Sequence, residues 1–455
     1  MASDRRAAAE AQSAADLGLA DAAAAIAAGR LRSTELVGAC LERIAAKDGD
    51  IGAFAALDPS FAMEQAERAD RWRATGNGVG PLHGVPVAVK DVIDTAGFAT
   101  EYGSPIFAGR RPAKDAFAVS ALRAAGAVII GKTVSTELAL LTPSAVRNPI
   151  AAGHSPGGSS AGSAAAVASH MVPAALGTQT AGSVLRPASY CGVYGYKPTF
   201  GMISRRGVLM QSHTLDTLGM LTRSIADTAL LADCLAVHDP DDDVSEPASR
   251  PRLAGIASTE PPALPLFAFV KTPPWSDADP RMHEAYGELV AALGDAIVEE
   301  IEAPLLADVI EWQRVVQLAE NAAYYGPLLD QYPDKLSNGL RERLTLGAAV
   351  PVRQYLEAYN SREAGYAAVS RLFDRYTAIL TPAAPGPAPR LEEGITGSPI
   401  FNGLWTYLGM PAISLPLLEV DGLPLGVQLV GPRHDDGRLL RTARWLERHL
   451  ETSMG

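Results

Sequence analysis

Apolar residues follow two different spacings in the first third of the chain. Over 33–46 ("STELVGACLERIAA") they recur every three or four positions, which predicts an amphipathic helix. Over 82–91 ("LHGVPVAVKD") they form a continuous run, which predicts a buried strand that ends at Lys90. A second helical pattern follows at 116–126, and strand-like patterns cross 127–140. This alternation of strand and helix indicates an α/β fold.

The pattern changes beyond residue 141. Residues 142–222 are rich in Gly, Ser, Thr and Pro, which predicts loops and short strands around a site. The acidic, proline-bearing run 238–252 indicates an exposed linker or a surface excursion, and 280–376 is mostly helical in pattern. The rest of the chain predicts three short strands and a final helix, at 378–385, 411–418, 423–431 and 437–451. We therefore expect a helical insert that caps a sheet built from both ends of the chain.

Composition narrows the class of protein. Of the 455 residues, 47% are hydrophobic and 20% are charged, which is typical of a folded globular protein. A net charge of -12 with no basic run argues against binding to nucleic acid or to an anionic membrane. Three scattered cysteines and an N-terminal segment without an apolar core predict a cytoplasmic protein. The histidines at 83, 154 and 213 lack metal-ligand spacing, so we expect neither a metal nor a cofactor.

A glycine- and serine-rich stretch, "HSPGGSSAGSAAAVASH" at 154–170, is the first candidate site. It matches neither glycine-rich phosphate-binding pattern. Residues 158–162 match G-x-S-x-G, the nucleophile turn of α/β-hydrolases, with Ser160 as nucleophile and His434 as the available late histidine. A flexible linker or a tight packing turn is the simpler interpretation. The stretch alone leaves these alternatives open.

A second serine, further along the chain, favours a catalytic site over a simple linker or packing turn. Ser183 follows a turn of small residues, 180–182, whose N–H groups could converge on an oxyanion. A serine hydroxyl needs a base, and a lysine can serve if burial keeps it uncharged. Two serine-bearing turns and Lys90 at a strand end therefore form a candidate constellation that requires no histidine.

Six segments together resemble one known family. They recur in family order over roughly 30–445 and are "GVPVAVKD", "GKTVSTELAL", "RNPIAAGHSPGGSSAGSAAAVA", "GTQTAGSVLRPASYCGVYGYKPTFG", "GMPAISLPL" and "GLPLGVQLVGP". On these segments the chain resembles the amidase signature family. The resemblance implies a mixed central β-sheet flanked by helices on both faces, with a helical cap. The expected layout is an N-terminal helical extension and one domain: 1–30, then 31–450 with its core at 60–235 and 377–450, a variable helical region at 263–376 and an exposed linker at 238–262.

The resemblance also implies site residues. Ser183 becomes the acylated nucleophile, Lys90 the base, and Ser159 the bridging serine on a cis peptide bond after Gly158. The oxyanion hole is then formed by the N–H groups of four successive residues: Thr180, Ala181, Gly182 and Ser183. Water would release the acyl group from Ser183.

Other positions are expected to support this machinery. Substrate contacts are predicted for Gly158, Arg186, Asn402 and Trp405, with a structural cation as the alternative for Arg186 and core packing as the alternative for Trp405. Ser160 is expected to cap a helix or to join the proton relay. Asp216 resembles a family position that braces the Ser183 turn.

Three departures from the family bear on the substrate. Ala181 replaces a glycine of the usual turn, and Leu185 stands where many members have arginine, with Arg186 carrying the charge one place later. The third departure is the set of helices predicted at 280–376, where family members differ most. We therefore predict a stand-alone amidase, monomer or homodimer, that hydrolyses small acyl amides, carbamates (urethanes) or esters. The alternatives are a glutaminase similar to the A subunit of the tRNA-dependent amidotransferases that works with a partner chain, an esterase using Ser160, or a non-catalytic homologue.

Overall fold

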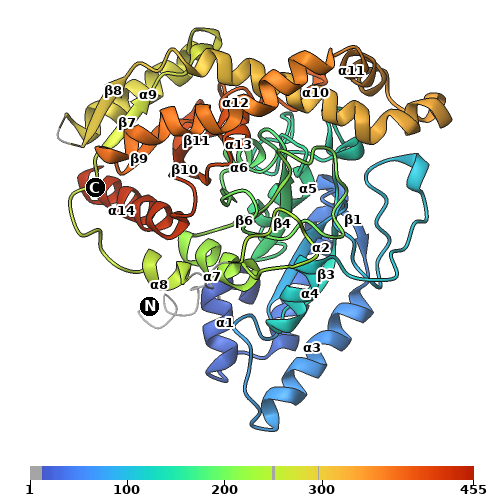
Figure 1. Cartoon of the computed structure of the whole chain (residues 1–455). Coiled ribbons are helices and arrows are strands. Elements are labelled where there is room, and N and C mark those ends of the chain that lie inside the picture. Colours follow the sequence, from blue (N-terminus) through green and yellow to red (C-terminus); the bar gives the residue numbers. More distant parts are fainter. Residues whose placement is uncertain (1–12, 248–251, 296, 455) are drawn as a thin grey trace.

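One mixed β-sheet runs through the molecule (Figure 1). The computed structural model describes residues 13–247, 252–295 and 297–454, and within them the sheet has 11 strands. Their order across the sheet is β1 (Phe54–Leu57), β3 (Val128–Thr133), β2 (Pro86–Lys90), β4 (Ala174–Gln179), β6 (Thr217–Thr222), β5 (Tyr194–Lys197), β10 (Ala412–Val420), β11 (Leu423–Val430), β9 (Ala378–Pro382), β7 (Phe267–Val270) and β8 (Val298–Ile301). Antiparallel β5 and β10 join the strands of the first half of the chain to those of the second.

Helices cover both faces of the sheet. Parallel strands β2, β3 and β4 are connected through α4 (Phe117–Ala124) and α5 (Ala161–Ala168), which lead the chain across the sheet in opposite directions. Because such crossovers are right-handed, the two helices lie on opposite faces. Helix α6 (Leu185–Cys191) packs beside α5, whereas α7 (Ile225–Leu235) and α14 (Asp436–Met454) lie on the side of α4. The remaining helices around this core are α1 (Leu19–Ala27), α2 (Ser33–Ile51), α3 (Pro59–Ala74), α8 (Leu253–Ala257), α9 (Pro280–Leu293) and α13 (Gly403–Tyr407).

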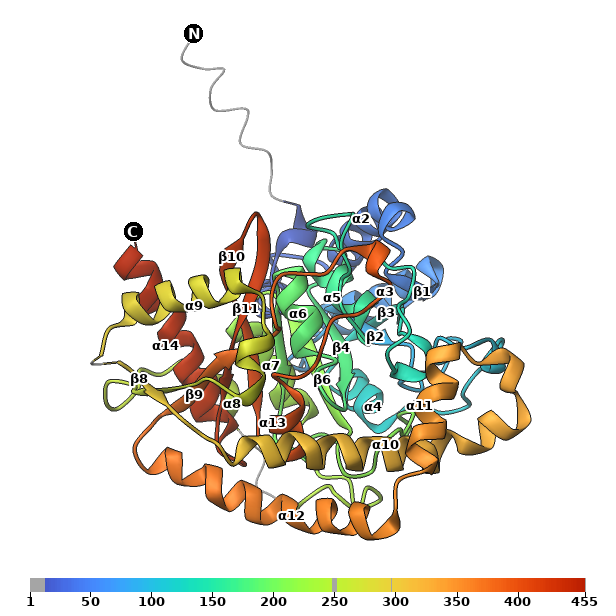
Figure 2. The same cartoon turned by 90° about the horizontal axis from the view of Figure 1, so that it is seen from above.

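Three long helices form a cap at one side of the molecule (Figure 2). They are α10 (Leu306–Gln331), α11 (Asn338–Ala348) and α12 (Val352–Ser370), and α10 contacts both of the others as well as α13. Apolar residues of α10 and α12 join a second core cluster with residues of β9 and α13. Helix α13 therefore connects the cap to the sheet.

The predicted architecture is confirmed, with two local corrections. The helix from residue 33, the strand ending at Lys90 and the C-terminal strands and helix all form as the patterns predict. The predicted strand across 132–140, however, ends at Thr133, and the predicted loop region 142–222 contains α5 and α6. Of the expected extension at 1–30, residues 1–12 lie outside the described residues, and α1 packs against α7.

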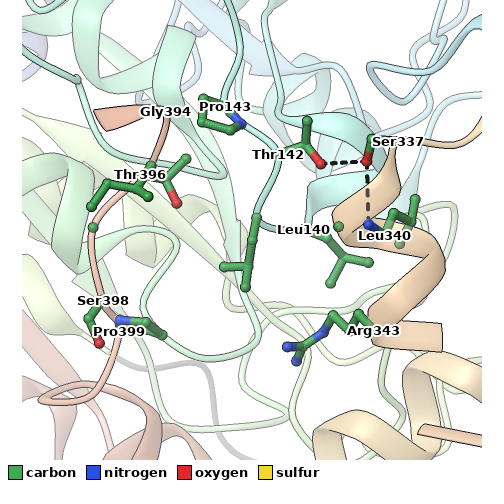
Figure 3. Close-up of a pocket in the computed structure, with 14 residues that line it drawn as sticks. Leu140, Thr142, Pro143, Ser337, Leu340, Arg343, Gly394, Thr396, Ser398 and Pro399 are labelled. Atoms are coloured by element: carbon green, nitrogen blue, oxygen red, sulfur yellow. Dashed lines mark hydrogen bonds between the residues drawn. The ribbon is translucent and has the colours of Figure 1, made fainter. Parts of the chain in front are cut away.

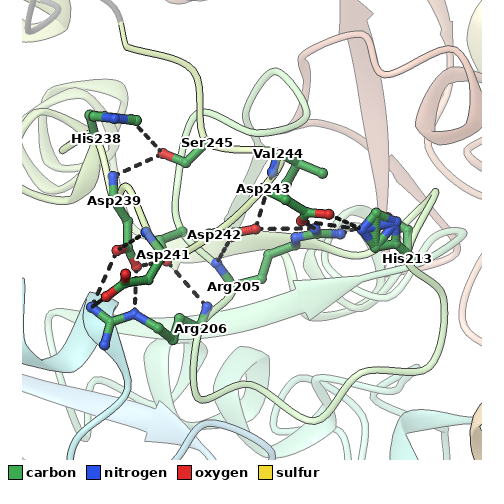
Figure 4. A network of polar contacts seen from close by, with 11 residues as sticks. Arg205, Arg206, His213, His238, Asp239, Asp241, Asp242, Asp243, Val244 and Ser245 are labelled. Atoms are coloured by element: carbon green, nitrogen blue, oxygen red, sulfur yellow. Dashed lines mark hydrogen bonds and ion pairs between the residues drawn. The ribbon is translucent and has the colours of Figure 1, made fainter.

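The acidic run is not a simple exposed linker. Figure 4 shows its aspartates turned toward Arg205 and Arg206. Asp239 is fully buried and accepts hydrogen bonds from Arg206 Nε at 2.8 Å, and buried Asp242 accepts one from the Arg205 N–H at 2.6 Å. Within the expected linker 238–262, α8 also forms a short helix. Arg205 and Arg206 neutralise the buried carboxylates of Asp239 and Asp242, so the run follows the surface with most of its described residues exposed and is held at these two positions.

Candidate active site

Lys90 lies at the carboxyl end of β2, a strand buried along its whole length. Its side chain is fully buried, and its ammonium nitrogen donates to Ser159 Oγ at 2.7 Å and to Thr178 Oγ1 at 2.8 Å. Burial lowers the pKa of Lys90 well below 10.5, and the charge of Arg186 lowers it further, against an opposing effect of Asp216. An uncharged lysine beside a serine hydroxyl can accept that hydroxyl's proton.

The Gly158–Ser159 segment is held from several sides, and its peptide bond is cis. The Ser159 carbonyl accepts a hydrogen bond from the Thr136 N–H at 3.2 Å, and the Gly158 carbonyl accepts one from Arg186 Nη2 at 2.6 Å. A Cβ atom on Gly158 would lie 2.9 Å from Thr136 Cγ2 and 3.0 Å from Thr396 Cγ2. Glycine is therefore the residue that fits this position.

Ser183 lies in the turn between β4 and α6, against the Ser159 segment. Its carbonyl accepts a hydrogen bond from the Ser160 N–H at 3.2 Å. Gln179 fixes the turn because its Oε1 accepts hydrogen bonds from the N–H groups of Val184 and Leu185, at 2.9 and 3.0 Å. The half-buried Ser183 side chain belongs to the lining of a cavity, whereas Ser159 is buried behind it.

The backbone of this turn can bind a negative charge. In the part of the chain that the structure describes, the N–H groups of 180–183 donate to no other protein group. Four successive N–H groups beside one hydroxyl suit an oxyanion that forms when the hydroxyl attacks a carbonyl.

Asp216 braces the start of the same turn. Its carboxylate accepts hydrogen bonds from Thr180 Oγ1 at 2.5 Å, from the Gln211 N–H at 2.7 Å and from the Ser212 N–H at 3.0 Å. Burial raises the pKa of Asp216 to about 6, which those hydrogen bonds oppose. The side chain therefore links the loop at 211–216 to the turn that carries Ser183.

Arg186 is a buried cation with a structural contact. Besides the Gly158 carbonyl, Nη2 approaches Thr396 Oγ1 at 3.4 Å, while Nε and Nη1 have no partner among the described residues. Burial lowers the pKa of Arg186 to about 10. Nη2 therefore holds the Gly158 carbonyl in place, and Nε and Nη1 remain without a partner among the described residues. Arg186 also lines the cavity that Ser183 lines.

Asn402 and Trp405 of the α13 region are fully buried. Asn402 Nδ2 donates to the Ala383 carbonyl and to Gln428 Oε1, both at 3.0 Å. Its Oδ1 lies so close to Gly182 that a Cβ atom added to this glycine would be 2.5 Å away. Trp405 packs in the second core cluster. Core packing therefore accounts for Trp405, and Asn402 packs against Gly182 in the turn that carries Ser183.

The esterase alternative requires a histidine on Ser160, and no histidine hydrogen-bonds to the Ser160 hydroxyl in the described part of the chain. Ser160 is fully buried, and its Oγ interacts with the backbone of Thr178 in β4 at 3.3 Å. The exposed His434 side chain instead lies 3.9 Å from Glu246. Ser160 directly precedes α5, but its hydroxyl does not cap that helix.

Two adjoining cavities lead to Ser183. The inner one, about 40 Å³, is lined by residues of the turn 180–183 together with Arg186, Gln211 and Gln317. The outer one, about 630 Å³, lies between the segments 140–143, 337–343 and 394–399 (Figure 3). Both are lined by Leu140, Leu141, Arg343 and Pro399. The outer cavity is mostly apolar, and the inner one reaches the half-buried Ser183 side chain.

The comparisons with known proteins identify the family. The family profile described as amidase matches residues 35–440. The chain belongs to the amidase signature family. Within the described residues of this family member, no group of three or more His, Cys, Asp or Glu could hold a metal ion. Nor does any described helix have the length and apolar character needed to cross a membrane.

Relatives match the amidase signature chain over nearly its full length. It is 33% identical to the A subunit of the glutamyl-tRNA(Gln) amidotransferase of Desulforapulum autotrophicum, over 95% of this chain and 97% of the relative. The solved peptide amidase of Stenotrophomonas maltophilia is 30% identical, with a TM-score of 0.84 over 96% of this chain and 97% of that one. A solved protein described in connection with a vestigial complex and the origins of an s-triazine catabolic enzyme is also 30% identical, with a TM-score of 0.89 over 95% and 98%.

Two residues beside the candidate site are not found by sequence reasoning. Thr178 supplies the second hydroxyl on Lys90; its position at the end of β4, two residues before Thr180, is the signal that could have found it. Arg343 points into the cavities from α11 (Figure 3), and no comparable signal identifies it. Its Nε donates to Asn321 Oδ1 at 2.9 Å, and burial lowers the pKa of Arg343 to about 10. It forms no ion pair with any described residue.

Proposed function

We propose that this protein hydrolyses the C–N bond of small acyl amides through an acyl-enzyme on Ser183. The observation that carries the proposal is the contact of 2.7 Å between buried Lys90 and Ser159, next to a turn with unpaired N–H groups. Membership in the amidase signature family and the likeness to a peptide amidase support amide chemistry. Carbamates and esters are further substrates of the proposed enzyme because the same acyl-enzyme forms from all three.

The steps follow from the proton affinities of the three side chains. Uncharged Lys90 takes the Ser159 proton, Ser159 takes the Ser183 proton, and Ser183 Oγ forms a bond to the substrate carbonyl carbon. The N–H groups of 180–183 bind the resulting oxyanion. When the C–N bond breaks, the leaving nitrogen receives a proton through Ser159 from Lys90. Water then adds to the ester, loses its proton to the same relay, and releases the acid and Ser183.

Arg343 indicates which acyl amides fit best. Its guanidinium, which has no ion-pair partner among the described residues, lies where the outer cavity meets the inner one, close to the turn that holds Ser183. A partly buried cation without a protein counter-charge favours an anionic ligand. We therefore propose amides that carry a carboxylate or a similar anionic group at a short distance from the reacting carbonyl.

A substrate panel with one variant tests this preference. We expect Arg343→Gln to raise KM for dicarboxylic half-amides at least tenfold, or roughly 1.4 kcal/mol in binding, and to leave neutral aliphatic amides within twofold. The matched control is Arg341→Gln on the same helix, because the half-buried Arg341 side chain hydrogen-bonds only to Pro333 and Asn338 among the described residues. Equal effects on charged and neutral amides would remove Arg343 from substrate recognition.

The catalytic proposal has its own test. A fluorophosphonate should add covalently to Ser183 of the wild type and not to Ser183→Ala, as read by intact mass and peptide mapping. An unlabelled wild-type protein, or a label on Ser160, would reject the Ser183 mechanism.

A glutaminase that works with a partner chain is the second candidate. It is favoured by 33% and 37% identity to the A subunits of two glutamyl-tRNA(Gln) amidotransferases, the second from Anaeromyxobacter sp., each over 95% of this chain. Glutamine belongs in the substrate panel for this reason: a chain that is inactive on every amide alone, but hydrolyses glutamine with a co-purified partner chain, would establish the second function.

A further inference from the structure

Helix α10 of the cap reaches the loop behind the oxyanion turn through two adjacent buried residues, Glu320 and Asn321. Glu320 accepts hydrogen bonds from the hydroxyl of Ser212, from both the N–H and the hydroxyl of Thr214, and from Tyr355 OH of α12. Its two oxygens therefore receive four donors, which satisfies a buried carboxylate.

Asn321 extends the same contact in two directions. Its Nδ2 donates to the Gln211 carbonyl at 2.9 Å, and its Oδ1 accepts from Arg343 Nε at 2.9 Å. Gln211 lines the inner cavity, and its own side chain donates to the Ala139 carbonyl at 3.2 Å on the opposite wall.

The loop held by this pair is the one that presents donors to Asp216. The Gln211 and Ser212 N–H groups both donate to Asp216 Oδ2, and Asp216 Oδ1 accepts from Thr180 at the head of the oxyanion turn. The Ser212 side chain donates to Glu320 while its backbone donates to Asp216. Ser212 therefore connects helix α10 of the cap to Asp216, which braces the turn at 180–183.

We propose that Glu320 is a positioning residue for the reaction, acting through Ser212 and Asp216 on the geometry of the turn at 180–183. The inference rests on the proposed function, since it assumes that this turn binds the oxyanion. In this proposal the cap does more than cover the substrate, because its helix α10, from the variable region, fixes the turn at 180–183. Glu320 lies outside the linings of both cavities, so it acts without contact to the substrate.

The primary variant is Glu320→Gln, which keeps the volume and removes two of the acceptor positions. We expect the rate of fluorophosphonate addition to Ser183 to fall at least tenfold, and kcat on the best amide to fall with it, while KM stays within twofold. Ser212→Ala should slow the reaction similarly. Because both act through one contact, the double variant should be no slower than the slower single variant.

Controls separate positioning from general stability. Glu311→Gln on the same helix, where Glu311 pairs only with exposed Arg314, should react within twofold of the wild type. If Glu320→Gln does not fold, Thr214→Val removes a hydroxyl donor from the same carboxylate and carries the same expectation.

Two outcomes overturn the inference. One is a folded Glu320→Gln that labels at the wild-type rate; the other is a pair of single effects that multiply in the double variant. A wild type that does not label at Ser183 rejects the proposed function instead, so the two failures are distinguishable.

Discussion

Lys90 is the residue whose chemistry depends most on its surroundings. At the surface its ammonium would keep its proton far above neutral pH, but here burial lowers its pKa well below 10.5. The neutral hydroxyls of Ser159 and Thr178 hydrogen-bond to the nitrogen without adding a charge that would restore the proton. The role as a base that we propose for Lys90 therefore depends on the fold and not on the identity of the residue alone.

The pH dependence of labelling at Ser183 should report this base. Activity requires uncharged Lys90, so it is present above the folded-state pKa and falls about tenfold per unit as pH drops below it. Lys90→Ala should lose the reaction at every pH. Since the pKa of Asp216 is also raised, to about 6, an Asp216→Asn variant is the control. Persistence of the acid limb in that variant assigns it to Lys90, and its disappearance would assign it to Asp216.

Helices α5 and α6 show why some elements could not be predicted at the element scale. The pattern of α5, "AGSAAAVA", consists of small residues whose first seven members are all buried, so no polar face marks a helical period. All seven residues of α6 are buried as well. In contrast, the amphipathic spacing of α2 and the continuous apolar run of β2 are visible in the sequence, and both elements form as predicted.

The contact between α10 and α11 decides where Arg343 lies. Gly347 of α11 packs so closely that a Cβ would come within 2.1 Å of the Leu318 carbonyl of α10. Gly347→Ala should therefore move α11, lower the free energy of unfolding by about 1–3 kcal/mol, and raise KM while labelling of Ser183 by a small probe changes little. Urea unfolding and steady-state kinetics measure both effects.

Gly326→Ala provides the comparison on α10, since nothing lies within 4 Å of its added Cβ. It should leave KM unchanged and, as an alanine inside a helix, keep or raise stability by up to about 1 kcal/mol. If both variants change KM alike, packing of α11 does not set the position of Arg343.

At the scale of the whole molecule, the two halves of the sheet meet at β5 and β10, and Lys197 is buried at this junction. Its Nζ donates to the Pro198 carbonyl at 2.9 Å, and burial lowers the pKa of Lys197 to about 7. Above that pH the folded protein holds one proton fewer at this site than the unfolded chain, whose lysine keeps a pKa near its ordinary value of about 10.4.

Stability should therefore rise with pH above about 7 because of this group. The contribution to the slope of unfolding free energy approaches about 1.4 kcal/mol per pH unit until the unfolded lysine titrates. Lys197→Met should remove that share of the slope between about pH 7.5 and 9, as measured by urea unfolding at several pH values. An unchanged slope would mean that Lys197 keeps its proton in the folded protein.

The sequence by itself determined the α/β class, the strand that ends at Lys90, and the candidate set of Lys90, Ser159 and Ser183. These features are carried by local periodicity and by motifs that occur in a fixed order. Only the tertiary structure decided that Thr178 completes the surroundings of Lys90, that Arg343 faces the cavity, and that Glu320 holds the loop behind the turn. Lys90 and Thr178 are 88 positions apart, and Glu320 and Ser212 are 108 apart. Contacts over such separations depend on how the sheet and cap pack together, which no local pattern encodes.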